Sequence, residues 1–197
     1  MTARAATGTP QLRQRIVAEA TRLFAEQGYA ATSVRQVVEA SGCTKPALYY
    51  YFDSKDALFR ELVEMHVATV TEVLEEWAGS GETVRASAHR AASRVIDYAS
   101  ANPDIMRLLQ RIEMRAEQGA PEINLMAARD MHLQLISRLI EKGIREGQIR
   151  RGVDALDCAL VLAGAMSFQF ELSLYTNTWE RQRIHRTIDL IFDGIGA

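Results

Sequence analysis

Cysteine is scarce in this sequence, and the placement of its two residues argues against a disulfide-stabilised secreted domain. Cys43 and Cys158 lie far apart and form no CxxC pair. Because small secreted domains carry several closely spaced cysteines, this pattern indicates no disulfide framework and fits a protein of the reducing cytosol.

Segments that target a chain to a membrane are also missing. The first residues, MTARAATGTP, lack an apolar h-region, so residues 1–9 are predicted to form a disordered tail and not a signal peptide. No apolar run approaches the length that we expect of a bilayer-spanning helix. The sequence therefore predicts a cytoplasmic protein with no membrane partner.

The residue spacings that mark common catalytic and metal sites are absent as well. The four histidines form neither HExxH nor ExxH, and the sequence has no GxSxG motif and no glycine-rich phosphate loop. We expect no enzyme activity, no metal and no cofactor. The histidines are interpreted as hydrogen-bonded structural residues, and they are His66, His89, His132 and His185.

Charge is balanced overall but unevenly distributed. The formal net charge is −2. Residues 1–60 carry eight Lys or Arg against five Asp or Glu, a balance of +3, whereas the remaining 137 residues carry fifteen against twenty, a balance of −5. A basic N-terminal part on an acidic body favours a polyanion-binding module at the N-terminus.

Nearly the whole sequence has the periodicity of α-helices. Apolar residues recur at steps of three and four, and the alternation typical of strands is almost absent. The predicted fold class is all-α, with helices at about 11–27, 33–41, 45–52, 55–78, 82–100, 104–117, 122–146, 153–176 and 179–194. The second to fourth helices have alternative candidates for their N-terminal residues: Thr32 or Ser33, Thr44 or Lys45, and Asp53 or Ser54.

The stretch CTKPALYYYFDSKDALF at 43–59 indicates a helix-turn-helix motif, because a short helix, SGCT and a second short helix have its spacing. On a helical wheel Leu48 and Phe52 share one face and are predicted to be core. Tyr50 points away from that face, and Tyr49 and Tyr51 flank it. A phenol in this position can donate to a phosphate oxygen and lay its ring against sugar and base edges.

From Gln11 to Phe59 the sequence resembles the N-terminal domain of the tetracycline-repressor (TetR) family. The resemblance rests on RIVAEATRLFAEQGYAATSVRQVVEASG followed by CTKPALYYYFDSKDALF. It implies an all-helical dimer that places its third helix in the major groove. It further implies a C-terminal body that senses a small molecule and releases DNA when the ligand binds.

Carried over by position, the resemblance implies a set of DNA-contacting residues: Ser33, Arg35, Thr44, Lys45, Pro46, Ala47, Tyr49, Tyr50, Tyr51 and Lys55. In this reading Lys55 meets a phosphate at the start of the fourth helix. Ser33 and Thr44 are equally well explained as N-caps, and the two roles are compatible. Cys43 departs from the usual Val of the turn and is interpreted as a small buried hydrophobe. Tyr50 occupies a variable position, so no operator sequence can be transferred.

The resemblance also implies a ligand pocket enclosed by the middle helices. Candidate lining residues are Met106, Leu109, Met126, Phe168 and Phe170, with ordinary core as the alternative for each. Arg107, Arg111 and Arg115 lie four residues apart and could attract an acidic ligand, although a solvated helix face explains them too. The effector is expected to have apolar character.

The last two predicted helices are interpreted as dimer elements. Small side chains form one stripe and isoleucines form another, and the residues are Ala159, Ala163, Ser167, Ile184, Ile188 and Ile191. In a monomer the final helix would pack inward instead. The family resemblance favours a four-helix interface made by two chains.

These observations predict three parts: the tail at 1–9, a three-helix DNA-binding domain with the helix-turn-helix at 10–54, and a larger helical ligand-binding and dimerisation domain at 55–197. The function predicted is a homodimeric repressor that binds a pseudo-palindromic operator and is released by a small molecule. An activator or a ligand-independent regulator on the same fold remains open. A helical enzyme or interaction protein with a vestigial helix-turn-helix is the alternative from another class.

Overall fold

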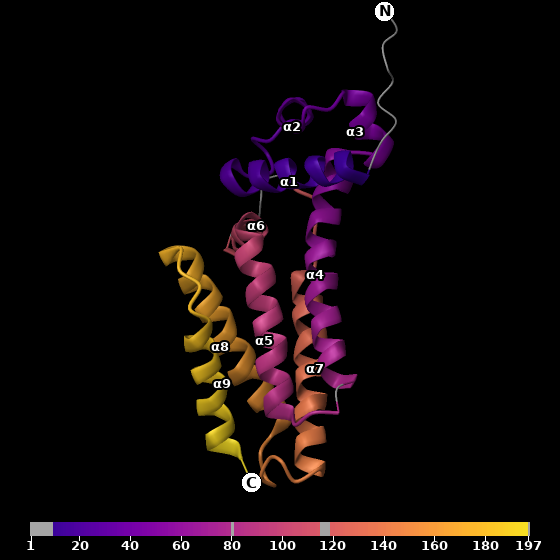
Figure 1. Cartoon of the computed structure of the whole chain (residues 1–197). Helices are drawn as coiled ribbons and strands as arrows, with labels where there is room; N and C mark the ends of the chain where they lie inside the picture. The colour runs from indigo at the N-terminus through magenta and orange to yellow at the C-terminus, as the bar shows by residue number, and fades with distance from the viewer. Residues whose placement is uncertain (1–9, 80, 115–118, 197) are drawn as a thin grey trace, which may run out of the picture. The chain divides into compact units, whose positions relative to one another are not determined.

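The computed structural model describes residues 10–79, 81–114 and 119–196, so the tail predicted at 1–9 lies outside the described residues. Within them the chain forms nine α-helices and no β-strand, as the all-α prediction requires (Figure 1). The chain divides into two compact units. The first comprises Met1–His66 and Asp104–Ile123, and the second comprises Val67–Pro103 and Asn124–Ala197.

The first unit contains the helices at the N-terminal end of the chain and one helix from its middle. Its elements are α1 (Pro10–Gln27), α2 (Val34–Ser41), α3 (Lys45–Tyr51), the start of α4 (Lys55–Gly79) and nearly all of α6 (Pro103–Met114). Each begins and ends within a few residues of its predicted bounds. The domain boundary predicted at residue 54 lies at the start of α4, and α4 itself continues into the second unit.

Side-chain caps set the ends of the two short helices. Ser33 caps α2: its hydroxyl accepts from the Gln36 N–H, and the Gln36 side chain accepts from the Ser33 N–H in return. Gly42 ends α2 with φ 62, a left-handed conformation that glycine adopts without strain. Thr44 then caps α3, because its hydroxyl accepts from the Ala47 N–H at 3.3 Å. These caps force the tight turn between α2 and α3.

An aromatic cluster forms part of the core of the first unit. The Phe59 ring lies edge-on to both Phe24 and Tyr29, with 5.0 Å between ring centroids in each pair. Leu48 and Phe52 are buried as predicted, with exposed fractions of 0% and 2%. α3 therefore has one face buried in this core and the opposite face free.

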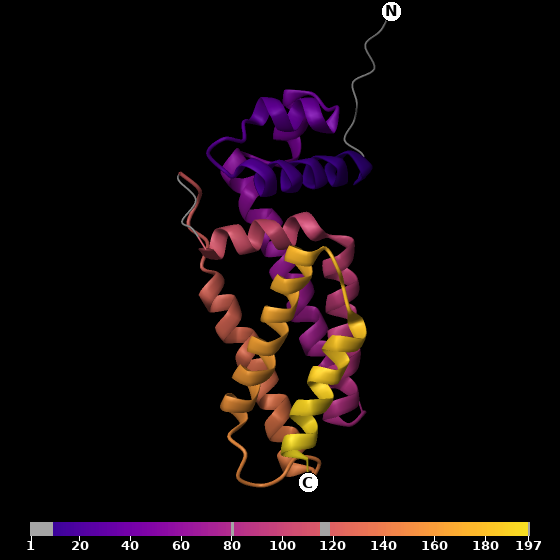
Figure 2. The ribbon, with the colours of Figure 1, turned by 90° about the vertical axis from the view of Figure 1, so that its left-hand side faces the viewer.

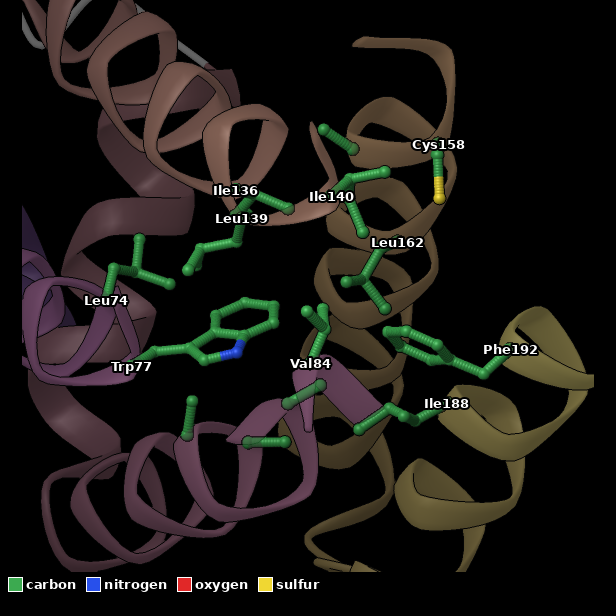
Figure 3. Packing of buried hydrophobic residues seen from close by; sticks show 14 of the residues in the cluster. Leu74, Trp77, Val84, Ile136, Leu139, Ile140, Cys158, Leu162, Ile188 and Phe192 are labelled. Carbon is green, nitrogen blue, oxygen red and sulfur yellow. The ribbon is translucent and has the colours of Figure 1, made fainter. Parts of the chain in front are cut away.

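The second unit packs the remaining helices around an apolar core. It contains the rest of α4, α5 (Val84–Ala101), α7 (Leu125–Arg145), α8 (Ala155–Thr176) and α9 (Arg181–Ile195). α7 packs on α8, and α9 packs on both α5 and α8 (Figure 2). Figure 3 shows the Trp77 ring lying between Leu74, Leu139 and Val84, with Leu162 and Phe192 closing the far side of the cluster.

One glycine allows a close approach in this core. A Cβ atom at Gly143 in α7 would lie 2.8 Å from Ile149 Cδ1 and 3.0 Å from Val84 Cγ2. Both distances are shorter than ordinary van der Waals contact, so no larger side chain fits without displacement of its neighbours. Gly143 thus sets how closely α7 approaches α5 and the turn that follows α7.

α8 corrects the expectation that no apolar run is long enough to span a bilayer. Ala155–Thr176 is long and apolar enough to do so by length and composition, with a mean hydropathy of 1.4. One such helix is weak support for a membrane segment, because helices of soluble proteins pass the same test. Only 22% of its most apolar stretch is buried, so α8 is not enclosed on all sides within one copy of the chain.

Candidate nucleic-acid interface

The outer face of α3 presents aromatic rings beside a cation. Tyr50 has 77% of its surface exposed and Tyr49 has 41%, whereas Tyr51 is half-buried. The Tyr50 and Tyr51 rings meet edge to face at 5.1 Å, and Lys45 Nζ lies 5.9 Å from the centroid of the Tyr49 ring. The helix thus carries a partly ordered aromatic surface with a positive charge at its N-terminal end.

The start of α3 is arranged as predicted, with one exception. Lys45 and Pro46 are exposed, and Ala47 is half-buried. Proline in the first turn removes no hydrogen bond that the helix needs. Thr44 is exposed while its hydroxyl caps the helix, so capping leaves the other side of the oxygen open to a ligand. Ala47 therefore contributes less free surface than the prediction assumed.

The start of α2 adds a further exposed pair. Ser33 is exposed and its hydroxyl is occupied by Gln36, to which it donates at 2.9 Å. Arg35 forms an ion pair with Glu39 at 2.7 Å, and this hydrogen bond raises the pKa of Arg35. The Arg35 side chain is 85% exposed. A DNA phosphate could therefore replace Glu39 as the partner of Arg35 at little cost in desolvation.

Lys55 is the predicted DNA contact that the structure places differently. Its ammonium donates to the carbonyl oxygens of Tyr29 and Thr32, at 2.9 Å each, and lies 3.8 Å from the centroid of the Tyr29 ring. Burial lowers the pKa of Lys55. Two of the three ammonium donors are therefore used within the first unit, and the geometry supports a structural role. The predicted phosphate contact stays a prediction.

Tyr29 completes this arrangement. Its hydroxyl donates to the Asp56 carboxylate, and burial followed by this hydrogen bond raises the pKa of Tyr29. The N-terminus of α4 is thereby tied to the segment between α1 and α2. Sequence reasoning missed this role because Lys55 and Tyr29 are 26 residues apart, and no local pattern connects them.

Two family models match the chain. "Bacterial regulatory proteins, tetR family" matches residues 16–62, which contain α2, α3 and the tyrosines, and "Tetracyclin repressor-like, C-terminal domain" matches residues 85–183. The chain belongs to the TetR family. It is a DNA-binding transcriptional regulator of the helix-turn-helix type, as the sequence predicted, and these TetR models indicate no catalytic function.

Individual proteins share sequence or fold with this chain. The nucleoid occlusion factor SlmA of Haemophilus ducreyi is 28% identical over 142 residues, which span 71% of this chain and 69% of SlmA. The crystal structure of the TetR regulator PfmR from Thermus thermophilus shares the fold, with a TM-score of 0.74 and 24% identity over 93% of this chain and 100% of PfmR. FadR from Bacillus subtilis, solved in complex with stearoyl-CoA, has a TM-score of 0.72 and 17% identity, covering 93% and 99%.

The residues predicted to line a ligand pocket in this TetR protein lie in different surroundings. Leu109 is buried and Met106 half-buried on α6, in the first unit. In the second unit, Phe170 is half-buried and its ring lies 6.1 Å from that of Trp179. Met126 and Phe168 are 62% and 65% exposed, so the structure does not support an enclosed position for these two.

The predicted arginine stripe is described only in part. Arg107 is exposed and forms an ion pair with Asp104 at 2.8 Å, one turn back on α6. Arg115 lies outside the described residues. An exposed pair within one helix fits the alternative of a solvated face better than a site for an acidic ligand.

The residues predicted for the dimer interface need correction. Ile184 and Ile188 each have 1% of their surface exposed, and Ala159 has none, because all three pack in the core of the second unit. A side chain buried in its own subunit leaves no surface for a second copy, so the structure does not support these three assignments. Ala163 and Ile191 are half-buried, and Ser167 is exposed.

Other residues of the same two helices are free instead. Large apolar side chains of α8 and α9 are exposed, and this set is called here the α8/α9 face: Leu156, Leu160, Val161, Phe168, Tyr175 and Leu190. Leu156, Leu160 and Phe168 follow the helical repeat of four, and this stripe was the sequence signal that the prediction overlooked.

His89, His132 and His185 are hydrogen-bonded between helices, as their structural interpretation predicted. His132 Nε2 lies 2.9 Å from the Thr71 hydroxyl, which joins α7 to α4. His89 contacts Asp189, and His185 contacts Ser93, so both join α5 to α9. Burial lowers the pKa of His132 and of His185.

Proposed function

We propose that this protein is a homodimeric transcriptional repressor that binds a pseudo-palindromic operator and is released by a small apolar molecule. One observation carries the DNA-binding part: α3 exposes Tyr49 and Tyr50 on one face while Leu48 and Phe52 bury the other. A helix held in this way can enter the major groove without losing its packing.

The exposed groups of α3 suit contact with both the phosphates and the bases of DNA. Lys45 supplies a positive charge, and the Thr44 hydroxyl is exposed beside it, so both can meet phosphate oxygens. Tyr50 presents a ring edge and a hydroxyl group, which fit thymine methyl groups and base-edge acceptors. We assign phosphate contact to Lys45 and base reading to Tyr50.

The α8/α9 face supports the dimeric part of the proposal. Phe168 and Tyr175 on α8 and Leu190 on α9 are 65%, 90% and 75% exposed in one copy of the chain. Contiguous exposed apolar side chains mark association surfaces, because leaving them in water is unfavourable. Two copies related by a two-fold axis would bury the same face of each chain. This arrangement also accounts for the apolar surface of α8 without a membrane, in keeping with a cytoplasmic DNA-binding protein.

The effector is proposed from the family and from a structural relative. FadR from Bacillus subtilis was solved with stearoyl-CoA, a molecule with a long apolar chain. Within the second unit, Phe170 remains a lining candidate, because it is half-buried beside the Trp179 ring. An effector acts by binding the DNA-free conformation more tightly than the DNA-bound one, so it lowers operator affinity by the ratio of those affinities.

Selection of bound duplexes from a random library tests the proposal. We expect an inverted repeat, occupied by two chains, with an affinity that falls steeply as salt rises. Compounds that raise the melting temperature are then added to the complex, and at least one should weaken operator binding. A selected sequence without inverted symmetry would overturn the dimeric part, and stabilising compounds that all leave affinity unchanged would overturn the sensor part.

A further inference from the structure

Two charged side chains of α2 pair with each other on the surface of the first unit. Arg35 Nε donates to a carboxylate oxygen of Glu39 at 2.7 Å, one helical turn further along α2. The two side chains are 85% and 60% exposed, so they meet in water and not in the core. In the chain without DNA, the Arg35 guanidinium therefore already binds one carboxylate.

Both charges lie at the end of α2 where the helix dipole opposes them. Arg35 is in the first turn, where the backbone N–H groups give a partial positive charge, and Glu39 is in the last turn, where the carbonyl groups give a partial negative charge. Their order is also the less favourable one, because an acidic residue that precedes a basic one stabilises a helix better than the reverse. The stability of α2 does not explain the pair. Charges that break a local rule are expected where function requires them.

Uncharged groups stabilise the two ends of α2 instead. At the first end, Ser33 and Gln36 exchange two hydrogen bonds. At the last end, the Gly42 N–H donates to the carbonyl oxygen of Glu39 at 3.3 Å. The carboxylate of Glu39 takes no part in these caps, so a neutral side chain of the same shape at position 39 should leave both ends of α2 intact.

The place of Arg35 suits contact with a phosphate. The first helix of a helix-turn-helix crosses the DNA backbone, and helix N-termini and arginines are common phosphate ligands. Arg35 lies two residues after the Ser33 cap and is the more exposed member of its ion pair. Its Nε–H group, which a phosphate oxygen would accept from, is the group that Glu39 occupies. A phosphate and the Glu39 carboxylate therefore compete for one guanidinium.

We propose that Glu39 is an intramolecular competitor of DNA, whose carboxylate holds Arg35 in the free chain and must be displaced by a phosphate when α2 meets the DNA backbone. Glu39 is a positioning residue, because it acts through Arg35. Its effect is independent of base sequence, so it lowers binding to the many non-specific sites of a genome. This inference rests on DNA binding through α2 and α3, and it does not depend on the proposed dimer, operator symmetry or effector.

The expected size of the effect is modest. Exposed pairs four residues apart on a helix are weak, so loss of the competitor corresponds to about a two-fold rise in DNA affinity for each subunit. A guanidinium that is freed from its carboxylate supplies up to one further phosphate contact. The slope of log affinity against log salt should therefore steepen, by up to about 0.9 per subunit.

Glu39→Gln tests the proposal with a random-sequence duplex, followed by fluorescence anisotropy over a series of salt concentrations. We expect tighter binding and a steeper salt slope. Glu26→Gln is the matched control, because it removes the same charge from an Arg–Glu pair of the same order and spacing on α1: Arg22 lies 2.9 Å from Glu26 and keeps Glu19 at 2.9 Å. The control gives the effect of net charge alone. Equal affinities and slopes in the two variants would overturn the proposal.

A double-mutant cycle shows whether Glu39 acts through Arg35. Arg35→Gln alone should weaken binding to the random duplex and flatten the salt slope. In the Arg35→Gln background, Glu39→Gln should change affinity no more than Glu26→Gln does. If Glu39→Gln raises affinity as much without Arg35 as with it, the carboxylate acts by repulsion of phosphates and the competitor is refuted. If Arg35→Gln leaves DNA affinity unchanged, Arg35 is no phosphate contact and the inference fails with it.

NMR of the arginine Nε–H signals examines the pair in the full chain without DNA. Glu39→Gln should shift the Arg35 Nε–H signal and speed its exchange with water, whereas Glu26→Gln should leave that signal in place. An Arg35 signal that is the same in wild type and Glu39→Gln would show that the carboxylate does not hold the guanidinium. A chain that passes these tests but selects no inverted repeat would contradict the proposed dimeric repressor and leave the role of Glu39 standing.

Discussion

The ammonium of Lys55 lies over the ring of Tyr29 and donates to the carbonyl oxygen of the same residue, at 3.8 Å and 2.9 Å respectively. The Lys55 side chain thus donates a hydrogen bond to the Tyr29 carbonyl and also contacts the Tyr29 ring, just beyond the end of α1. The same ammonium reaches the Thr32 carbonyl, next to the Ser33 cap of α2. The position of the helix-turn-helix therefore depends on a residue at the start of α4.

Lys55→Met should lower the free energy of unfolding by about 1–3 kcal/mol, because it leaves two carbonyl oxygens without their charged donor. Urea unfolding, monitored by circular dichroism, measures this loss. Lys45→Met is the matched control at the exposed start of α3. It should leave stability within about 0.5 kcal/mol and reduce the slope of log affinity against log salt by roughly one per subunit. If Lys55→Met instead keeps full stability and reduces the salt slope, the phosphate role predicted from the sequence is correct.

Tyr50→Ala should weaken binding of the preferred operator by about 1–3 kcal/mol per half-site and leave the salt slope nearly unchanged, because it removes a base contact but no charge. Fluorescence anisotropy with preferred and scrambled duplexes measures both quantities. Leu48→Ala, on the buried face of the same helix, should lower stability by about 2–5 kcal/mol. Full operator preference in Tyr50→Ala would remove Tyr50 from the recognition surface.

The elements that sequence reasoning placed well are those whose causes are local. Ser33, Thr44 and Gly42 fix the helix ends through contacts within a few residues, so their residue types are enough to find them. The buried face of α3 follows from the spacing of Leu48 and Phe52 in the same way.

The features that sequence reasoning missed concern partners that are far away in sequence. The stripe of Ile184 and Ile188 shows that one face of α9 is buried, but periodicity does not say whether its own chain or a second copy covers it. α8 is apolar on several faces, so its periodicity did not identify which face is buried in its own chain. The partner of Lys55 is likewise set by the fold, since Tyr29 is 26 residues away.

Gly143→Ala should destabilise the second unit by about 1–3 kcal/mol, because the new methyl group would lie 2.8 Å from Ile149 Cδ1. Gly194→Ala in α9 is the control, since a Cβ there meets nothing within 4 Å. It should stabilise the chain by up to about 1 kcal/mol through the higher helix propensity of alanine. Thermal unfolding of both variants distinguishes the two sites. Equal changes in melting temperature would show that Ile149 moves away from the new methyl group without loss of stability.

Leu160→Glu and Ile188→Glu should fail in different ways, although both put a carboxylate in place of an apolar side chain on neighbouring helices. Leu160 is 47% exposed on the α8/α9 face, so its variant should remain folded and sediment as a monomer, because a charge opposes burial between two copies. Ile188 is 1% exposed inside its own subunit, so its variant should lose cooperative unfolding. Analytical ultracentrifugation and circular dichroism, each run at micromolar concentration, measure the two outcomes.

Leu160→Glu should also lose most of its operator affinity, because one chain then contacts one half-site. A stable dimer in Leu160→Glu would exclude this part of the α8/α9 face from the interface.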